Sequence, residues 1–301
     1  MHFLIAQESL AVFNDRNSPV TRQFPMSQHF SAPISPPVIR NAPSPMESKA
    51  LAFFTILLVW NDILSSSTRK QATVDSKGYR ELLAKRDFAL AFWDVAECDS
   101  WILSAVMDIT TLDIWKREEE CKGKLSIREL ANRAGTIEST IEAHIKHLAE
   151  LLDSQAASTD AKPPGKIDGD YIRHVQTNIL AHSILIELHA IVSGHWAGVP
   201  EINESIDRAI LAWKRCPSSM TPRCFVWSFC VSANLATGLQ RVFFQEVMLQ
   251  MTLADKALGR LHNVKLLVEK CWSVFDRRGS NRDSCEDWKD IWQEMNMSIP
   301  F

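Results

Sequence analysis

The chain has 301 residues, of which 46% are hydrophobic, and a formal net charge of −3 with a pI near 6.3. This length and apolar content suffice for one large or two small domains with a buried core. A domain that grips DNA by itself is usually basic, because neutralised phosphates supply much of the affinity. The seven cysteines include no C-x-x-C pair. The composition therefore argues against a domain that binds DNA by itself, a disulfide scaffold and a structural zinc site.

Residues 1–46 are predicted to form a disordered tail. Seven of the thirteen prolines fall within residues 17–46, mixed with Ser, Asn and Gln, and such a stretch buries too little apolar surface to offset its ordering entropy. The tail holds three Ser-Pro pairs, at Ser18, Ser35 and Ser44. Proline-directed kinases phosphorylate such pairs, but a plain flexible tail is the simpler interpretation.

Residues 47–301 are predicted to be all-α, because apolar residues recur with helical spacing and Gly and Pro fall mostly between the periodic segments. A polar internal linker is expected at residues 154–169. The apolar run 50–60 is about half of a bilayer span, so we interpret it as a buried helix and expect no membrane association. Helices are predicted at residues 47–64, 78–94, 98–117, 126–134, 137–152, 168–193, 201–215, 222–236, 239–252, 255–276 and 284–296.

Three local signals place helix ends. Ser126 and Glu129 have the spacing of a capping box, in which each side chain satisfies a free amide at a helix start. Gly194 and Gly279 are typical of C-terminal stops, where the backbone turns left-handed.

The segment around Gly135 has the helix–glycine–helix order of a helix-turn-helix. A recognition helix needs Arg, Lys, Asn or Gln near its N-terminus, whereas this segment carries Glu138 and Glu142, which would face the phosphates. We therefore interpret it as a short antiparallel helix pair that packs on the domain. The segment is also similar to the dimerisation region of small-molecule O-methyltransferases, but the chain lacks the G-x-G turn that their cofactor domain requires.

Histidines and tryptophans are the other candidate functional residues. His182 and His189 lie two helical turns apart on one face, which favours hydrogen-bonded core or groove histidines over metal ligands. His144 and His147 are interpreted as surface residues. The ten tryptophans bury much area, so core packing is the simplest interpretation, and a pocket for a small-molecule inducer is the sharper alternative. No catalytic, cofactor-binding, metal-binding or DNA-binding residue is predicted.

Several short motifs occur in a characteristic order along residues 50–301. They are Val59-Trp60-Asn61-Asp62, Leu188-His189 with Ser193-Gly194, Val199-Pro200-Glu201-Ile202, Trp227-Ser228-Phe229-Cys230, Phe243-Phe244-Gln245, Glu269-Lys270-Cys271-Trp272 and Asp287-Trp288. In this order they resemble the C-terminal regulatory domain of fungal zinc-cluster transcription factors. The signature positions, structural or regulatory, are Trp60, Asp62, His189, Gly194, Pro200, Trp227, Cys230, Phe244, Trp272 and Trp288.

This resemblance implies an all-α domain of a nuclear transcriptional regulator that controls a local gene set, for example of secondary metabolism or drug response. It implies a homodimer or a heterodimer with a related factor, contacts with co-regulators, and no catalysis. The family's binuclear zinc cluster needs cysteines in a basic segment, and residues 1–50 hold none. DNA contact and zinc are therefore expected through an upstream module or a partner. The alternatives are a helical scaffold protein without regulatory activity and an O-methyltransferase remnant.

Overall fold

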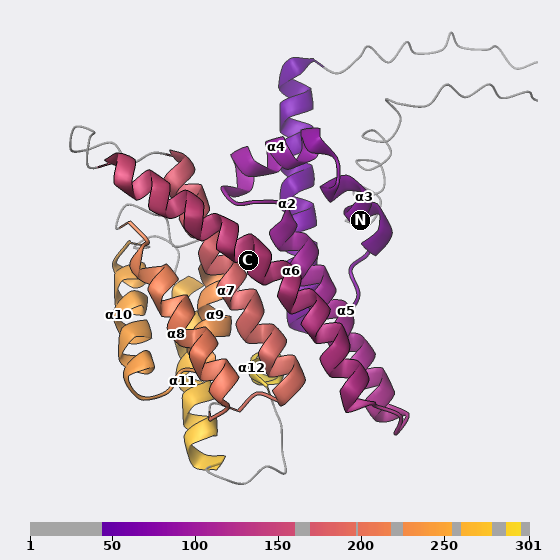
Figure 1. The fold of residues 1–301 in the computed structure, drawn as a ribbon, viewed down its shortest axis with the longest axis vertical. Helices are drawn as coiled ribbons and strands as arrows, with labels where there is room; N and C mark the ends of the chain where they lie inside the picture. The colour runs from indigo at the N-terminus through magenta and orange to yellow at the C-terminus, as the bar shows by residue number, and fades with distance from the viewer. Residues whose placement is uncertain are drawn as a thin grey trace, which may run out of the picture. The chain divides into compact units, whose positions relative to one another are not determined.

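A computed structural model describes residues 44–159, 169–196, 198–217, 225–254, 260–278 and 287–295. Within these ranges there is no β-strand, which confirms the all-α prediction (Figure 1). The helices are α2 Pro45–Arg69, α3 Ser76–Leu83, α4 Arg86–Ala96, α5 Trp101–Cys121, α6 Ile127–Thr159, α7 Gly169–Ser193, α8 Pro200–Lys214, α9 Val226–Asn234, α10 Gly238–Ala254, α11 Arg260–Arg278 and α12 Trp288–Glu294.

The chain divides into two compact units, residues 1–58 and 59–301, and α2 runs through the boundary. The start of α2 is a capping box: the Ser44 hydroxyl accepts the Glu47 N–H at 3.2 Å, and the Glu47 carboxylate accepts the Ser44 N–H at 2.7 Å. Pro45 occupies the first helical position, where its missing N–H costs nothing. The helix thus begins two residues before its predicted start at residue 47, and residues 1–43 of the predicted tail lie outside the described residues.

Helix α7 is the centre of the second unit. It packs against α5, α6, α8 and α9, and every side chain from Val175 to Leu188 is buried, as expected for a helix that is covered on all sides. By length and hydropathy alone, α2 and α7 are the two described helices that could cross a membrane. For α7 the apolar window is 89% buried inside the protein, and for α2 it is 39% buried.

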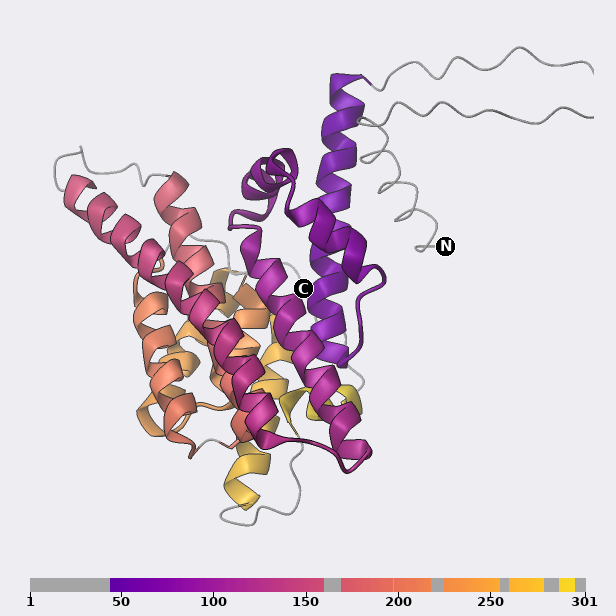
Figure 2. The same cartoon turned by 45° about the vertical axis from the view of Figure 1, so that its right-hand side comes forward.

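Helices α5 and α6 run antiparallel and side by side (Figures 1 and 2). The predicted short helix pair is wrong, because α6 continues through Gly135 as one helix and extends to Thr159 inside the predicted linker. The physical reason is an unbroken buried stripe on one face, formed by Leu130, Ala134, Ile141, Ile145, Leu148 and Leu152. Burial of this stripe offsets the roughly 1 kcal/mol that a glycine costs inside a helix. Residues 160–168 lie outside the described residues.

The predicted helix 78–94 is instead two helices, α3 and α4, with an extended Lys85 between them. Tyr79 in α3 and Phe88 in α4 are both buried. In one continuous helix these residues would be nine positions apart and would point to opposite faces. The break therefore allows both aromatic side chains to enter the core.

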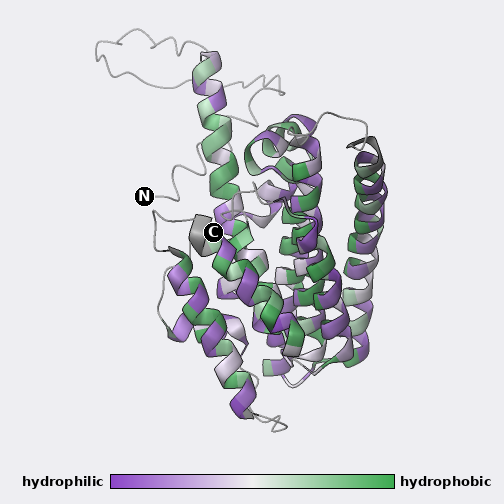
Figure 3. Ribbon diagram, turned by 90° about the vertical axis from the view of Figure 1, so that its left-hand side faces the viewer, coloured by the Kyte–Doolittle hydropathy of each residue, from purple (hydrophilic) through white to green (hydrophobic). Residues whose placement is uncertain are grey.

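The ends of α7 and α6 agree with the sequence signals. Gly194 follows α7 with a φ of 86°, a left-handed conformation that favours glycine, and the Ser126 hydroxyl accepts the Glu129 N–H at 3.3 Å at the start of α6. Gly279 lies outside the described residues. Hydrophobic and hydrophilic residues alternate along most helices of the second unit (Figure 3), as expected for helices with one buried face.

Candidate functional site

The candidate site is built around α9, whose nine residues are all buried. Its serine side packs on α7: the Ser183 hydroxyl lies 3.2 Å from the Ser232 hydroxyl and 3.4 Å from the Ser228 carbonyl oxygen. Its other side presents Phe229 to α10 and α11. A short, apolar, fully covered helix therefore supplies a fixed wall.

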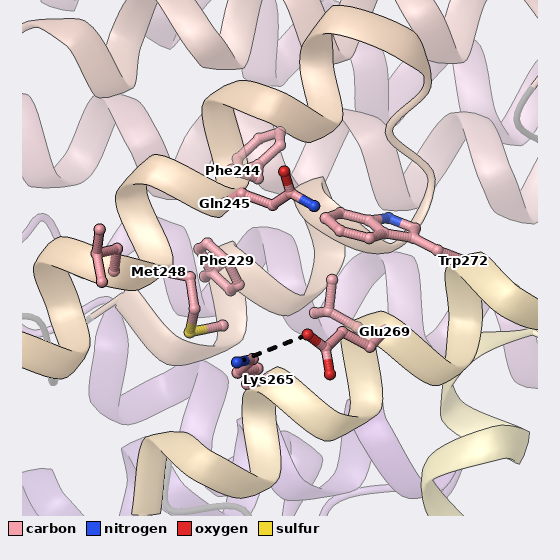
Figure 4. Close-up of a pocket in the computed structure, with 9 residues that line it drawn as sticks. Phe229, Phe244, Gln245, Met248, Lys265, Glu269 and Trp272 are labelled. Carbon is pink, nitrogen blue, oxygen red and sulfur yellow. Dashed lines mark ion pairs between the residues drawn. The ribbon is translucent and has the colours of Figure 1, made fainter.

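A pocket of about 350 Å³ opens between α9, α10 and α11 (Figure 4). Its floor consists of buried apolar side chains, namely Phe229, Phe244, Met248, Val268 and Trp272. Its mouth consists of more exposed side chains, namely Gln245, Leu249, Lys265 and Glu269. An apolar cavity with a few polar groups at its edge is the usual form of a small-molecule site.

The aromatic floor is held by ring contacts. The rings of Phe229 and Phe244 meet edge to face at a centroid distance of 5.7 Å and an angle of 83°. Behind them, Trp213 contacts Phe229 at 6.3 Å and 89°, and Phe243 contacts Phe244 at 5.3 Å and 78°. Edge-to-face pairs are a preferred geometry for aromatic rings, so ring contacts within the protein stabilise the floor without a ligand.

Trp272 is fixed from two sides. Its indole N–H donates to the Ala233 carbonyl oxygen at 2.7 Å, and the Arg241 guanidinium lies 5.3 Å from the centre of its ring. Arg241 is itself held by both carboxylate oxygens of Asp276, each at 2.8 Å, and by the Ala236 carbonyl oxygen at 2.8 Å. These contacts join the end of α9, the start of α10 and the middle of α11.

The mouth carries one ion pair with no net charge. Lys265 and Glu269 lie one helical turn apart on α11, with 3.7 Å between Nζ and Oε1, and both side chains are about half exposed (Figure 4). Such a pair contributes only about 0.3–0.5 kcal/mol. It can therefore open at little cost and offer a donor and an acceptor to another molecule.

A second polar centre lies beside α12, with side-chain exposures of 2% at Lys289, 1% at Glu187 and 13% at Asp113. The Lys289 ammonium pairs with the Glu187 carboxylate and lies 3.9 Å from Asp113 Oδ2. The Trp288 indole N–H donates to Glu187 Oε2 at 3.3 Å. Although burial opposes its charged form, the carboxylates of Glu187, Asp113 and Asp287 raise the pKa of Lys289. The lysine therefore stays charged inside the protein.

Asp287 links this centre to the C-terminal end of α2. It caps α12 by accepting the Lys289 and Asp290 N–H groups at 2.7 and 3.0 Å, and it pairs with Lys70 Nζ at 2.8 Å. Lys70 also pairs with Asp290 at 2.6 Å. Burial opposes ionisation of Asp287, but the charges of His195, Lys289 and Lys70 hold its pKa below the usual range. We call Lys70, Asp113, Glu187, Asp287, Lys289 and Asp290 the ion-pair cluster.

His189 is a hydrogen-bonded histidine, as predicted. Its Nδ1 lies 2.8 Å from the Ser205 hydroxyl and its Nε2 lies 3.0 Å from Glu138 Oε1. One turn further along α6, Glu142 accepts two hydrogen bonds from Arg208, at 2.6 and 2.8 Å. Both glutamates that would have faced DNA in a helix-turn-helix therefore bind α7 and α8 instead.

The other histidines divide into buried and surface positions. Burial, together with the nearby Arg208, lowers the pKa of His182 to about 4, so its ring is neutral near pH 7. His144 is not the plain surface residue that was predicted, because its ring stacks on Trp101 at 4.2 Å. His147 is exposed. Within the described ranges no group of three or more His, Cys, Asp or Glu side chains is arranged to hold a metal ion.

The signature positions fall into four places. Phe244 and Trp272 line the pocket, with Trp227 and Cys230 buried in α9 beside it. Trp288 lies in the buried layer under α12. The remaining signature positions lie in the α2–α3–α4 corner and at the junction of α7 and α8, where His189 belongs to the end of α7. They are Trp60, Asp62, His189, Gly194 and Pro200.

In the α2–α3–α4 corner, Asp62 accepts the Val74 N–H at 3.0 Å, and the Trp60 ring lies 5.9 Å from that of Phe92. Pro200 occupies the first position of α8. Of the tryptophans, Trp272 lines the pocket, whereas Trp213, Trp101 and Trp60 pack against other rings. Core packing thus explains these three.

Sequence reasoning missed the ion-pair cluster. Glu187 interrupts the apolar run of α7, and Lys289 stands between two apolar residues of α12 one turn apart, Trp288 and Ile291. Glu187 is a single charge within the buried part of α7, and Lys289 is a charge on the buried face of α12. That pattern was the available signal, because a buried charge requires a partner of opposite sign.

The fold and site define an all-α domain with a preformed apolar pocket and a buried ionic anchor. The chain belongs to the fungal specific transcription factor domain family, whose model matches residues 21–301. It is 38% identical to the ustiloxin B cluster transcription factor ustR of Aspergillus flavus, over 85% of this chain and 43% of that protein. It is 36% identical to the transcription factor phomR of Diaporthe leptostromiformis, over 84% of this chain and 45% of that protein.

A more distant relative is the trichothecene biosynthesis transcription regulator TRI10 of Trichoderma arundinaceum, with 27% identity over 64% of this chain and 41% of that protein. The chain thus spans less than half the length of the curated relatives it matches. The family and these relatives are named as transcription factors rather than enzymes. No solved structure matches the chain.

Proposed function

We propose that this chain is the regulatory domain of a nuclear transcription factor that controls a local set of biosynthetic genes. The observation that carries this proposal is the family match over residues 21–301, together with relatives that are named as regulators of biosynthesis or of a biosynthetic cluster. The all-α architecture agrees with the family, and the motifs that carry the resemblance lie in its core and around its pocket.

DNA contact is proposed to come from another module or a partner rather than from the described helices. The net charge of −3 provides little attraction to phosphates. In α6, the segment most similar to a DNA reader, the partly exposed Glu138 and Glu142 pair with His189 of α7 and Arg208 of α8. Two carboxylates at that position would also be repelled by phosphates, which opposes contact with base edges there.

Dimerisation or co-regulator binding is proposed as the mode of action. Leu239, Val242 and Leu249 on α10 are 86, 49 and 61% exposed, and spacings of three and seven residues put them on one face. Exposed apolar side chains gathered on one helix face are typical of protein interaction sites. This face is a described surface that supports a protein partner.

Transcript measurement in the source organism tests the proposal. Deletion of the gene is expected to change the transcript levels of neighbouring biosynthetic genes several-fold, and reintroduction of the wild-type gene is expected to restore them. Unchanged transcripts across the genome, under conditions in which the protein is produced, would contradict a regulatory role. That result would favour the helical scaffold alternative.

A further inference from the structure

The pocket between α9, α10 and α11 has the features of a ligand site. We propose that it binds a compact, uncharged aromatic molecule that carries one group able both to donate and to accept a hydrogen bond, such as a phenol or a lactam. Binding needs only the geometry of the pocket, whereas regulation of transcription by the bound molecule rests on the proposed function.

The size and walls of the pocket set the shape of the ligand. A volume of about 350 Å³ lies near the lower end of the roughly 300–1,000 Å³ range of small-molecule sites, so the ligand is compact. Three of the five floor residues are aromatic, namely Phe229, Phe244 and Trp272. Aromatic ligands gain edge-to-face or offset contacts with such walls that a saturated ring of equal size does not gain.

The walls are preorganised. Phe244 lies between Phe229 and Phe243, and Trp272 is held by the Ala233 carbonyl and by Arg241. A ligand therefore does not have to order these side chains, and it avoids the entropy cost that ordering would add. Trp272 contacts Ala233 of α9 and Arg241 of α10, so a molecule packed on its ring lies against a side chain that joins three helices.

The mouth sets the polarity of the ligand. Lys265 and Glu269 are both half-exposed and together carry no net charge, so an anion would be attracted by one and repelled by the other. A hydroxyl or an amide can instead donate to Glu269 and accept from Lys265, with Gln245 as a further amide partner at the edge. A hydrogen-bonding group that is uncharged and bifunctional fits this rim.

Two leucines of α10 provide a matched test. Leu249 lines the mouth, whereas Leu239 lies three helical turns away at the start of the helix and does not line the pocket. Both are exposed, at 61 and 86%, so a tryptophan at either position is tolerated by the fold. Leu249→Trp places an indole over the opening, and Leu239→Trp adds the same surface elsewhere.

The experiment is isothermal titration calorimetry of the full chain with 2-naphthol, 2-naphthoate and decahydro-2-naphthol, with circular dichroism to verify folding of both variants. We expect 2-naphthol to bind the wild type and Leu239→Trp with equal Kd, and Leu249→Trp to weaken binding at least 10-fold. The saturated alcohol should bind about 2- to 10-fold more weakly than 2-naphthol, and the anion should also bind more weakly.

No heat of binding for 2-naphthol, or equal binding by all three proteins, would overturn the proposal. Tighter binding of 2-naphthoate than of 2-naphthol would contradict the proposal that the ligand is uncharged. Loss of 2-naphthol binding in both variants would show that the exposed α10 face, not the pocket, holds the probe. Because transcript levels report the proposed function separately, a regulator without a ligand is distinguishable from a protein that does not regulate transcription.

Discussion

The pocket and the ion-pair cluster contain the same kinds of residues in opposite environments. Each has a lysine paired with a glutamate and a tryptophan that donates its indole N–H. In the pocket the lysine side chain is 54% exposed, and in the cluster it is 2% exposed. The exposed pair can exchange partners at little cost, while the buried pair cannot lose either member. Burial therefore makes one region adaptable and the other a fixed anchor.

Replacing the lysine with methionine should affect the free energy of unfolding very differently in the two regions. Lys289→Met leaves Glu187 buried without its cation, so we expect a loss of about 3–5 kcal/mol in the free energy of unfolding. Lys265→Met breaks an exposed pair, so we expect a loss below about 0.5 kcal/mol. Urea denaturation of the two variants measures both values.

A double variant controls for lost packing at Lys289. Lys289→Met combined with Glu187→Met removes both charges, and it should recover much of the stability that the single variant loses. If Lys289→Met costs no more than Lys265→Met, the buried anchor does not exist as described.

A buried histidine extends the comparison to proton binding. The pKa of His182 is lowered to about 4 in the folded protein, against about 6.5 unfolded. As the pH falls, His182 is therefore protonated in the unfolded chain before it is protonated in the folded protein. The free energy of unfolding should fall by about 3 kcal/mol as the pH drops from 6.5 to 4. Asp287 does not add to this change. Its pKa is lowered in the folded protein, so the stability that its charge provides is lost only as the pH falls below the unfolded value near 3.8.

Stability measured by urea denaturation at several pH values checks this expectation. His182→Gln keeps a polar side chain but does not titrate, so the slope between pH 6.5 and 4 should become shallower. An unchanged slope in this variant would assign the acid sensitivity to other groups, among them Glu142, whose pKa is lowered chiefly by its hydrogen bonds with Arg208.

The two indole N–H donors offer a comparison of intermediate size. Trp272→Phe leaves the Ala233 carbonyl without its side-chain donor, and we expect a loss of about 1–2 kcal/mol. Trp288→Phe removes a donor from the charged Glu187, and we expect about 1.5–3 kcal/mol, because hydrogen bonds to charged groups contribute more. Thermal unfolding ranks the two variants. A larger loss of stability for Trp272→Phe than for Trp288→Phe would contradict the view that the ion-pair cluster is the fixed anchor and the pocket the adaptable region.

Gly135→Ala lies outside both regions, and it is the one substitution expected to stabilise the protein. A Cβ at this position meets no atom within 4 Å, and the residue lies inside the continuous helix α6. Alanine should therefore stabilise the protein by about 0.5–1 kcal/mol through its higher helix propensity. Destabilisation in urea would instead support a left-handed glycine turn, and with it the helix pair that the sequence suggested.

Most of the fold could be predicted, because α8 has a regular apolar stripe, α5 and α7 are long apolar segments, and Gly194 and Pro200 mark a clear boundary. Helical periodicity failed at Gly135, where a local turn signal competed with a stripe that continues on both sides. It also failed at Lys85, because the change in helix phase between Tyr79 and Phe88 matters only when both side chains must enter one core.

The candidate site was predicted in parts. Phe244 and Trp272 stood out as signature residues, but the pocket depends on three helices meeting, and single-sequence patterns do not encode that arrangement. The ion-pair cluster was harder to predict, because Glu187 and Lys289 are separated by about a hundred residues in the chain. The exposed Lys265–Glu269 pair, in contrast, follows from helical spacing alone.

The central proposal is that this domain regulates transcription. The most direct measurement fuses the whole chain to a heterologous DNA-binding module and records a reporter gene with that module's binding sites, on both a weak and a strong promoter. We expect a several-fold change in reporter output, upward on the weak promoter or downward on the strong one, and no change when the module is expressed alone. Output equal to that of the module alone on both promoters, with the folded fusion present in the nucleus, would contradict it.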